Sequence, residues 1–94
     1  MCGRFGLTRP ERVDWRKLGV LHPPAGLVPR YNIAPGSDVL AVILRSGEPH
    51  AEYLRWGLIP YWARDPAIGS RLANARGDTA FEKPAFRAPM RSRR

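Results

Sequence analysis

The chain has 94 residues, which is enough for one small domain with a single hydrophobic core. Hydrophobic residues make up 44% of it and aromatic residues 10%, and this composition excludes an intrinsically disordered tail. Sixteen Lys and Arg against eight Asp and Glu give a formal net charge of +8, which favours a polyanionic partner. A GC-rich coding bias also enriches Arg, so the charge alone identifies no ligand.

The first predicted element is a helix over residues 8–18. It has a Thr N-cap, a proline in its first turn and a Glu at the capping-box position, and Gly19 ends it. Residues 22–30 show no periodicity and are predicted to form an extended loop. Residues 31–36 are predicted to form a turn that leads into the next element.

A hairpin is predicted in the middle of the chain. Residues 39–44 are apolar and β-branched, which indicates a buried strand. Residues 46–49 are typical of a turn, and residues 51–56 form the second strand. The two strands are expected to pair antiparallel.

Weaker signals follow the hairpin. Residues 63–70 are predicted to be a loop, because a proline and a glycine interrupt them, and residues 72–76 a short extended stretch. Asp78 or Thr79 is a suitable cap for a helix that Pro84 interrupts.

Membrane insertion and secretion are not expected. The longest apolar run is residues 39–44, which is far too short to span a bilayer. No apolar segment typical of a signal peptide follows the N-terminus. We therefore expect a cytoplasmic protein.

The residues exclude several kinds of site. The single cysteine allows no intrachain disulfide, and the sequence has no Cys/His zinc pattern, so no metal or other cofactor is predicted. The glycines do not form a phosphate-binding loop. His22 and His50 stand beside prolines in expected loops and are assigned no role.

Cys2 is the one candidate nucleophile. Removal of Met1 would give it a free α-amine, with a reference pKa of about 7.7–8.0, beside a thiol of about 8.5. The positive charge of Arg4 would lower both pKa values. The alternative is that Cys2 is a small apolar residue at a frayed terminus.

A 1,2-aminothiol reacts in a particular way with an aldehyde. The amine condenses to an imine, and the thiolate then closes on the imine carbon to give a stable thiazolidine. An abasic site in DNA exposes such an aldehyde on a phosphodiester backbone. Abasic DNA therefore offers both an aldehyde for the aminothiol and a polyanion for a basic protein.

Four side chains are candidate DNA contacts. Tyr61 and Trp62 are able to stack on bases beside the lesion, although core packing is the alternative for both. Arg4 and Arg76 are candidate phosphate ligands, against the alternative of solvated surface charges.

Four segments of the sequence together resemble one known family. They are Met-Cys-Gly-Arg-Phe at residues 1–5, Tyr-Asn-Ile-Ala-Pro at 31–35, Trp-Gly-Leu-Ile-Pro-Tyr-Trp at 56–62 and Asn-Ala-Arg at 74–76. In order and spacing they are similar to the SOS-response-associated peptidase (SRAP) family. Its members sense abasic sites in single-stranded DNA and crosslink to them, and the resemblance covers essentially the whole chain.

The resemblance implies roles for the candidate residues. Cys2 resembles the nucleophile that loss of Met1 exposes, and Asn74 the active-site asparagine that positions the sugar or the terminus. Trp62, with Tyr61 where a second Trp is common, resembles an aromatic wedge. Arg4 and Arg76 resemble phosphate-binding arginines, and Asn32 is interpreted as structural.

The resemblance also implies an α+β domain over residues 1–94, with a mainly antiparallel β core and short helices. Asp78 departs from the pattern, since the family usually has Glu there. Family members continue beyond residues 91–94 into segments that carry a catalytic Glu and a catalytic His, and this sequence contains neither. We therefore expect a truncated fold with an incompletely covered core, which favours self-association. Its stability is expected to be weak unless the chain dimerises or a separate chain completes the fold.

Three hypotheses follow. The first is an abasic-site sensor that crosslinks single-stranded DNA through Cys2 in the SOS response, with the family's autoprocessing peptidase and lyase-like chemistry. The second is a noncovalent basic module that binds single-stranded DNA. The third is an inactive fragment of a protein of this family.

Overall fold

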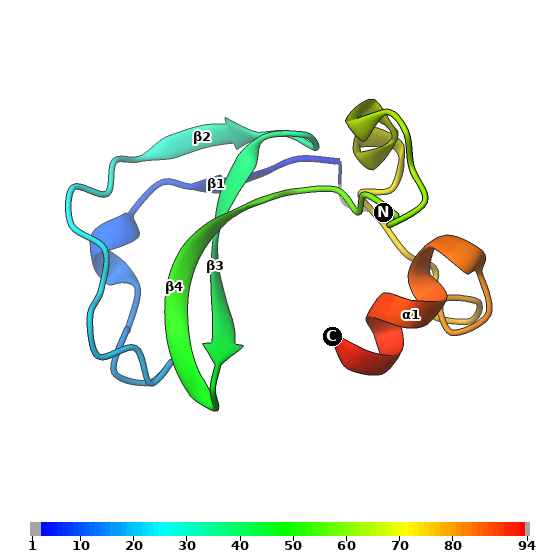
Figure 1. Ribbon diagram of the computed structural model, residues 1–94. Coiled ribbons are helices and arrows are strands. Elements are labelled where there is room, and N and C mark those ends of the chain that lie inside the picture. Colours follow the sequence, from blue (N-terminus) through cyan, green and yellow to red (C-terminus); the bar gives the residue numbers. More distant parts are fainter. Residues whose placement is uncertain (1–2, 94) are drawn as a thin grey trace.

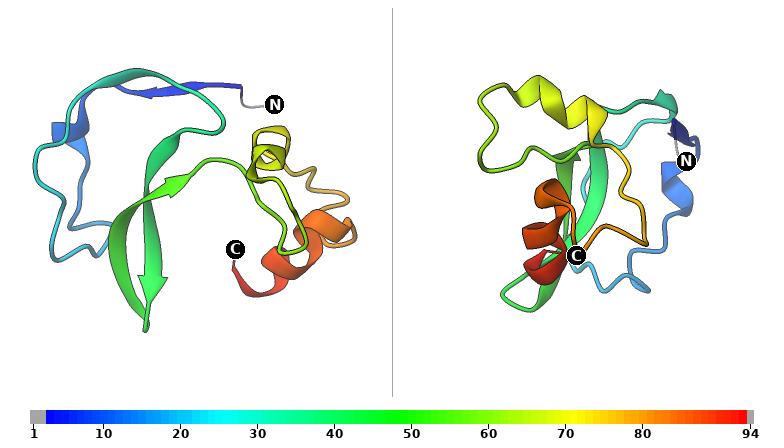
Figure 2. Two further views of the ribbon diagram at one scale, coloured as in Figure 1. Left: turned by 45° about the horizontal axis from the view of Figure 1, so that its top comes forward. Right: turned by 90° about the vertical axis from the view of Figure 1, so that its right-hand side faces the viewer.

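The computed structural model describes residues 3–93 and consists mainly of two small antiparallel sheets (Figure 1). Its elements in chain order are β1 (Phe5–Leu7), the 3-10 helix η1 (Pro10–Arg12), β2 (Arg30–Ile33), β3 (Asp38–Arg45), β4 (Glu48–Arg55), the 3-10 helix η2 (Pro66–Arg71) and α1 (Pro84–Ser92). This confirms the α+β class. The β3–β4 hairpin runs between an N-terminal part with β1 and β2 and a C-terminal part with η2 and α1 (Figures 1 and 2).

The hairpin confirms the prediction for the middle of the chain. Its register pairs Val42 with Ala51 and Arg45 with Glu48. Ser46 and Gly47 form the connection with φ values of 50° and 80°, and two positive φ values are the signature of a type I′ turn. Turn and strands therefore agree with the sequence pattern, except that Glu48 and Pro49 already belong to β4.

β2 replaces part of the predicted turn over residues 31–36. It pairs with β1 antiparallel, with Phe5 opposite Ile33 and a register shift before Leu7. The turn prediction is wrong here because the pairing partner lies more than 20 residues earlier, and a local pattern does not contain it. Arg30 fixes the start of β2 to the start of β3 by donating from Nη1 to the Asp38 carbonyl over 2.5 Å.

The predicted helix over residues 8–18 is also wrong. Only Pro10–Arg12 forms a 3-10 helix, and no side chain caps it. Val13, with φ −66° and ψ 122°, is already extended and ends it. The Asp14 carboxylate then accepts a hydrogen bond from the Lys17 amide over 3.1 Å, which favours a separate turn. Gly19, with φ 73°, ends that turn as expected.

The C-terminal elements differ from the prediction as well. The predicted loop over residues 63–70 contains most of η2, whose first turn is capped by the Asp65 side chain, which accepts from the Ala67 amide over 3.0 Å. Pro84 begins α1 instead of interrupting a helix, because the first helical position needs no amide hydrogen.

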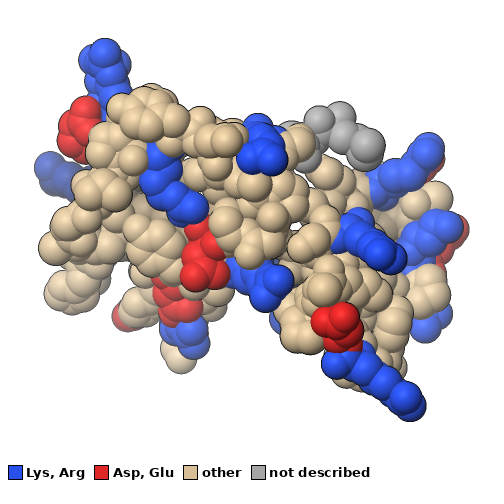
Figure 3. Space-filling model, turned by 90° about the horizontal axis from the view of Figure 1, so that it is seen from above, with Lys and Arg blue, Asp and Glu red and all other residues tan. Residues whose placement is uncertain are grey.

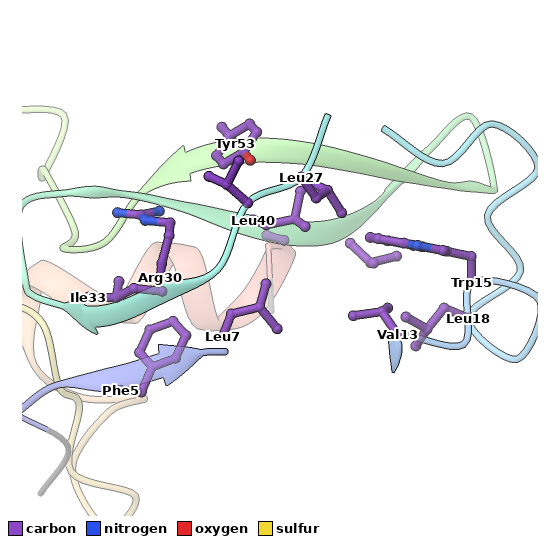
Figure 4. Close-up of a pocket in the computed structure, with 13 residues that line it drawn as sticks. Phe5, Leu7, Val13, Trp15, Leu18, Leu27, Arg30, Ile33, Leu40 and Tyr53 are labelled. Carbon is purple, nitrogen blue, oxygen red and sulfur yellow. The ribbon is translucent and has the colours of Figure 1, made fainter. Parts of the chain in front are cut away.

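The hydrophobic core is small. Val20, Ile33 and Ala80 are the buried hydrophobic residues among residues 3–93. Side chains of β1, β2, the hairpin and the segment after η1 surround an apolar cavity of about 180 Å³ (Figure 4). The chain exposes 7487 Å², whereas a compact monomer of its mass exposes about 5,500 Å². The exposed surface includes large hydrophobic side chains such as Leu21 and Leu44.

In the part of the chain that the structure describes, no helix has the length and apolar character that a membrane span requires.

Candidate nucleic-acid interface

Trp56 holds the segment that precedes Asn74. It follows β4 directly, and its indole Nε1 donates to the Ala73 carbonyl over 3.1 Å. Two residues further on, the Leu58 amide donates to the Leu72 carbonyl over 3.1 Å. These two bonds fix residues 72–74 beside the end of the hairpin, so the position of Asn74 depends on Trp56. Trp56 itself is partly buried.

The same indole brings the N-terminal strand to this place. The ring of Phe5 meets Trp56 edge-on, with centroids 5.4 Å apart and planes at 62°. Trp56 therefore contacts both the strand that follows Arg4 and the 72–74 segment. The Arg4 Nη1 donates to Asn32 Oδ1 over 3.2 Å, which agrees with the structural interpretation of Asn32. Cys2 lies outside the described residues.

A contact between two glycines positions the aromatic segment. Gly57 has φ 132°, and a Cβ atom built on it would lie 2.1 Å from the Gly69 carbonyl oxygen. Only glycine allows this approach, which holds the chain leading to Tyr61 against η2. The local sequence pattern does not reveal this contact, because Gly57 follows β4 and Gly69 lies in η2.

The two predicted stacking residues lie on the surface. Tyr61 is 93% exposed and Trp62 51% exposed, so neither serves as a core residue. A turn presents them, in which the Ala63 amide donates to the Pro60 carbonyl over 3.0 Å. Exposed aromatic rings of this kind are what stacking on unpaired bases requires.

A pocket of about 370 Å³ brings three of the predicted site residues together. These are Trp62, Asn74 and Arg76, whereas neither Arg4 nor Tyr61 lines it. The remaining lining residues come from the same segment and from the start of α1: Leu72, Thr79, Ala80, Lys83, Pro84, Ala85 and Phe86. Sequence analysis missed Lys83 and Phe86. Their signal is the helix start at Pro84, which a different interpretation of that proline would have found.

Arg76 is paired with the acidic residue two positions later. Its Nε and Nη2 donate to the two carboxylate oxygens of Asp78 over 3.2 and 3.1 Å. This hydrogen bonding from Arg76 is the main reason that the pKa of Asp78 lies below its ordinary value. Both side chains are exposed, so a phosphate is able to reach the guanidinium but competes with the carboxylate.

Positive charge is spread over the molecule. Lys and Arg side chains are scattered across the face shown in Figure 3, with a smaller number of acidic ones between them. No group of three or more His, Cys, Asp or Glu within residues 3–93 has a metal-binding arrangement. The interface therefore offers arginine, lysine, amide and aromatic groups, which suit a phosphodiester strand.

Comparisons with known proteins agree with this chemistry. The chain matches the family described as SOS response associated peptidase (SRAP) over residues 1–94. It is 43% identical over 96 aligned positions to the abasic site processing protein YoaM of Bacillus subtilis, with 100% of this chain and 42% of the relative covered. The abasic site processing protein YoqW of the same organism is 40% identical, with 100% and 43% covered.

A more distant relative is the abasic site processing protein YedK of Escherichia coli. It is 31% identical over 90 positions, which cover 87% of this chain and 40% of the relative. The chain thus spans less than half the length of the curated relatives it matches. No solved structure matches it significantly.

Proposed function

Because the chain belongs to the SOS response associated peptidase (SRAP) family, we propose that it recognises abasic sites in single-stranded DNA and crosslinks to them through Cys2. The observation that carries the proposal is the pocket that joins Trp62, Asn74 and Arg76. The relatives of the chain are named for processing abasic sites, which supports this lesion as the substrate. We place this activity on nucleoid DNA in the cytoplasm, as part of the SOS response.

The covalent step begins once Met1 has been removed, which is the peptidase step that the family name suggests. The free α-amine of Cys2 attacks the aldehyde carbon of the ring-opened sugar, and loss of water gives an imine. The Cys2 thiolate then adds to the imine carbon, and the imine nitrogen takes up a proton. The product is a thiazolidine, and the overall reaction joins protein and DNA with loss of one water.

The described side chains have distinct tasks in this proposal. The Asn74 amide hydrogen-bonds the opened sugar, and its place is set by the bond from Trp56 to Ala73. Arg76 and Arg4 bind phosphates on the two sides of the lesion, in competition with Asp78 and Asn32 respectively. Tyr61 and Trp62 stack on bases and keep the strand unpaired.

Condensation of an aldehyde with an aminothiol does not require a protein acid or base. General acid–base assistance typically accelerates such steps by about 10²–10⁴-fold. Cys2, a positioning amide and phosphate ligands are therefore sufficient to form the crosslink, and groups that move protons would raise its rate.

Intact mass spectrometry tests the proposal. The purified chain is incubated with a single-stranded oligonucleotide that carries one abasic site, and separately with one that carries a tetrahydrofuran analogue without an aldehyde. The expected product is the mass of protein plus abasic DNA less one water, starting from a protein without Met1. The analogue and the Cys2→Ala variant should give no adduct.

A noncovalent binding module is the alternative function, and the exposed arginines and aromatic residues favour it equally. It predicts salt-sensitive binding that ignores the lesion and survives Cys2→Ala. If the chain binds abasic and undamaged strands with equal affinity and forms no adduct, the noncovalent binding module replaces the crosslinking proposal.

We also propose that the chain self-associates through its incompletely covered core. About 2,000 Å² of surface is exposed beyond what a compact monomer of this mass shows, and a stable interface covers only about 800 Å² on each partner. The β3–β4 hairpin contributes exposed apolar side chains on both faces, including Leu44 and Leu54.

A further inference from the structure

The wall of the 370 Å³ pocket formed by the start of α1 has no part in the proposed reaction. Lys83 and Phe86, from the start of α1, line this pocket together with Trp62, Asn74 and Arg76. A volume of this size is at the lower end for small-ligand sites and suits one nucleotide better than a folded peptide.

Successive turns bring the two cations of the pocket together. The Ala80 amide donates to the Arg76 carbonyl over 2.9 Å, and the Lys83 amide donates to the Thr79 carbonyl over 3.0 Å. Ala80 is buried and anchors this segment. Arg76 and Lys83, seven positions apart, therefore line the same space, although a regular pattern of charges does not mark them.

The two cations differ in how much of their charge is compensated. Asp78 accepts hydrogen bonds from two nitrogens of the Arg76 guanidinium. Lys83 has no ion pair with any carboxylate within residues 3–93, and its side chain is exposed. A phosphate that enters the pocket therefore gains more at Lys83, where no carboxylate has to be displaced.

The apolar walls suit a base. Trp62 presents half of its surface to solvent, and the ring of Phe86 is half-buried at the first turn of α1. Two aromatic rings in one pocket offer stacking surface to any base, whatever its sequence. The pocket thus combines a base-sized apolar space with a lysine that has no ion pair within residues 3–93.

We propose that this pocket binds the nucleotide next to the abasic site, with its base against Trp62 and Phe86 and its phosphate on the Lys83 ammonium. The proposal rests on the function proposed above and adds a subsite to it. Lys83 and Phe86 are binding residues here and take no part in forming the thiazolidine.

The test measures binding separately from crosslinking. All variants are made in the full chain carrying Cys2→Ala, and fluorescence anisotropy follows binding of a labelled oligonucleotide with a tetrahydrofuran site at several salt concentrations. Lys83→Gln should weaken binding and reduce the slope of log affinity against log salt by about 0.7, the value for one phosphate on a single strand. Lys83→Arg should restore the slope.

Arg87→Gln is the matched control, because Arg87 is an exposed cation on the same helix that does not line the pocket. It should leave the slope nearer to that of the parent chain. Phe86→Leu keeps the apolar volume and removes the ring. It should weaken binding of a strand with a base next to the lesion, and not of a strand with a baseless spacer there.

The outcomes separate the two proposals. Equal salt slopes for the parent, Lys83→Gln and Arg87→Gln would overturn the nucleotide subsite, even if the chain with Cys2 crosslinks normally. A Lys83-specific loss of slope, together with no adduct between the chain that retains Cys2 and abasic DNA, would support the subsite and overturn the crosslinking function. Circular dichroism of each variant checks that its fold matches the parent.

Discussion

The indole nitrogen of Trp56 donates to the carbonyl oxygen of Ala73, and Ala73 directly precedes Asn74. Phe5 packs against the same indole from the N-terminal side. One side chain at the end of the hairpin therefore sets the distance between the strand that follows Cys2 and the asparagine of the proposed site. The site depends on this core contact as much as on its polar residues.

Trp56→Phe should separate the two tasks of this residue. The variant keeps an aromatic partner for Phe5 and loses the donor to Ala73, which leaves a carbonyl without its bond at a cost of about 1 kcal/mol. We expect a small loss in the free energy of unfolding, measured in urea, and a clearly slower crosslinking rate. Trp15→Phe, at the 180 Å³ cavity, is the control and should leave the rate unchanged. Equal effects on the rate from both variants would contradict the positioning role.

Gly57→Ala should destabilise the chain strongly. The new Cβ would lie 2.1 Å from the Gly69 carbonyl oxygen, and a φ of 132° strains any residue other than glycine. The combined cost of overpacking and strain is about 2–5 kcal/mol, read as a lower melting temperature. Gly47 has a positive φ, but a Cβ atom there would meet no neighbour within 4 Å. Gly77 has neither a positive φ nor a close neighbour. The losses should therefore rank Gly57 first, Gly47 second and Gly77 last; any other order would contradict the close approach.

The sequence predicted those parts of the fold that local chemistry determines. The hairpin is one, because a short β-branched run and a Ser-Gly turn specify it within 20 residues. The prediction from sequence failed for β2, because its partner strand β1 is distant in the chain. It also failed after η1, where the Asp14 carboxylate stabilises a separate turn in place of the expected helix. In the candidate site, the motif residues Trp62, Asn74 and Arg76 line one pocket. The sequence pattern did not predict Lys83 and Phe86 there, because their positions depend on the helix that begins at Pro84.

The ion pair between Arg76 and Asp78 should oppose DNA binding. Asp78→Asn removes a negative charge beside the guanidinium and frees its donors, so single-stranded DNA should bind more tightly near neutral pH. Because the pKa of Asp78 is lowered in the folded chain, the ion pair is fully present above the ordinary value of 3.8. It is lost as the pH falls through the lower folded value.

A carboxyl titration by NMR checks this direction, and anisotropy measures affinity. In Asp78→Glu the charge is kept, so its affinity should stay near that of the parent. Weaker binding by Asp78→Asn would show instead that the carboxylate holds Arg76 in its binding position.

Tyr61→Ala should weaken binding of single-stranded DNA without lowering the stability of the fold. Its ring is almost fully exposed, so the folded chain loses little packing when it is removed. A strand that stacks on it loses about 1–3 kcal/mol of binding free energy. Tyr31→Ala, another largely exposed tyrosine on β2, is the control for general loss of an aromatic surface. Anisotropy with an undamaged oligonucleotide measures both; equal losses would contradict a specific role for Tyr61.

Leu44→Lys should reduce self-association. Leu44 is 71% exposed at the end of β3, on the hairpin face that also carries Val42 and Tyr53, so a second copy would cover it. A charge there must lose its hydration when the interface forms, and it adds to the repulsion between chains of net charge +8.

Sedimentation equilibrium at several protein concentrations should show an associating parent chain and a more monomeric Leu44→Lys variant. His50→Lys is the matched control, because His50 is exposed on the opposite face of the same hairpin and gains a similar charge. Raised salt should strengthen association of the parent and of the control, since it screens the like charges. A parent that is monomeric at every concentration would contradict an interface at this face, and equal loss in both variants would assign the effect to net charge rather than to the Leu44 surface.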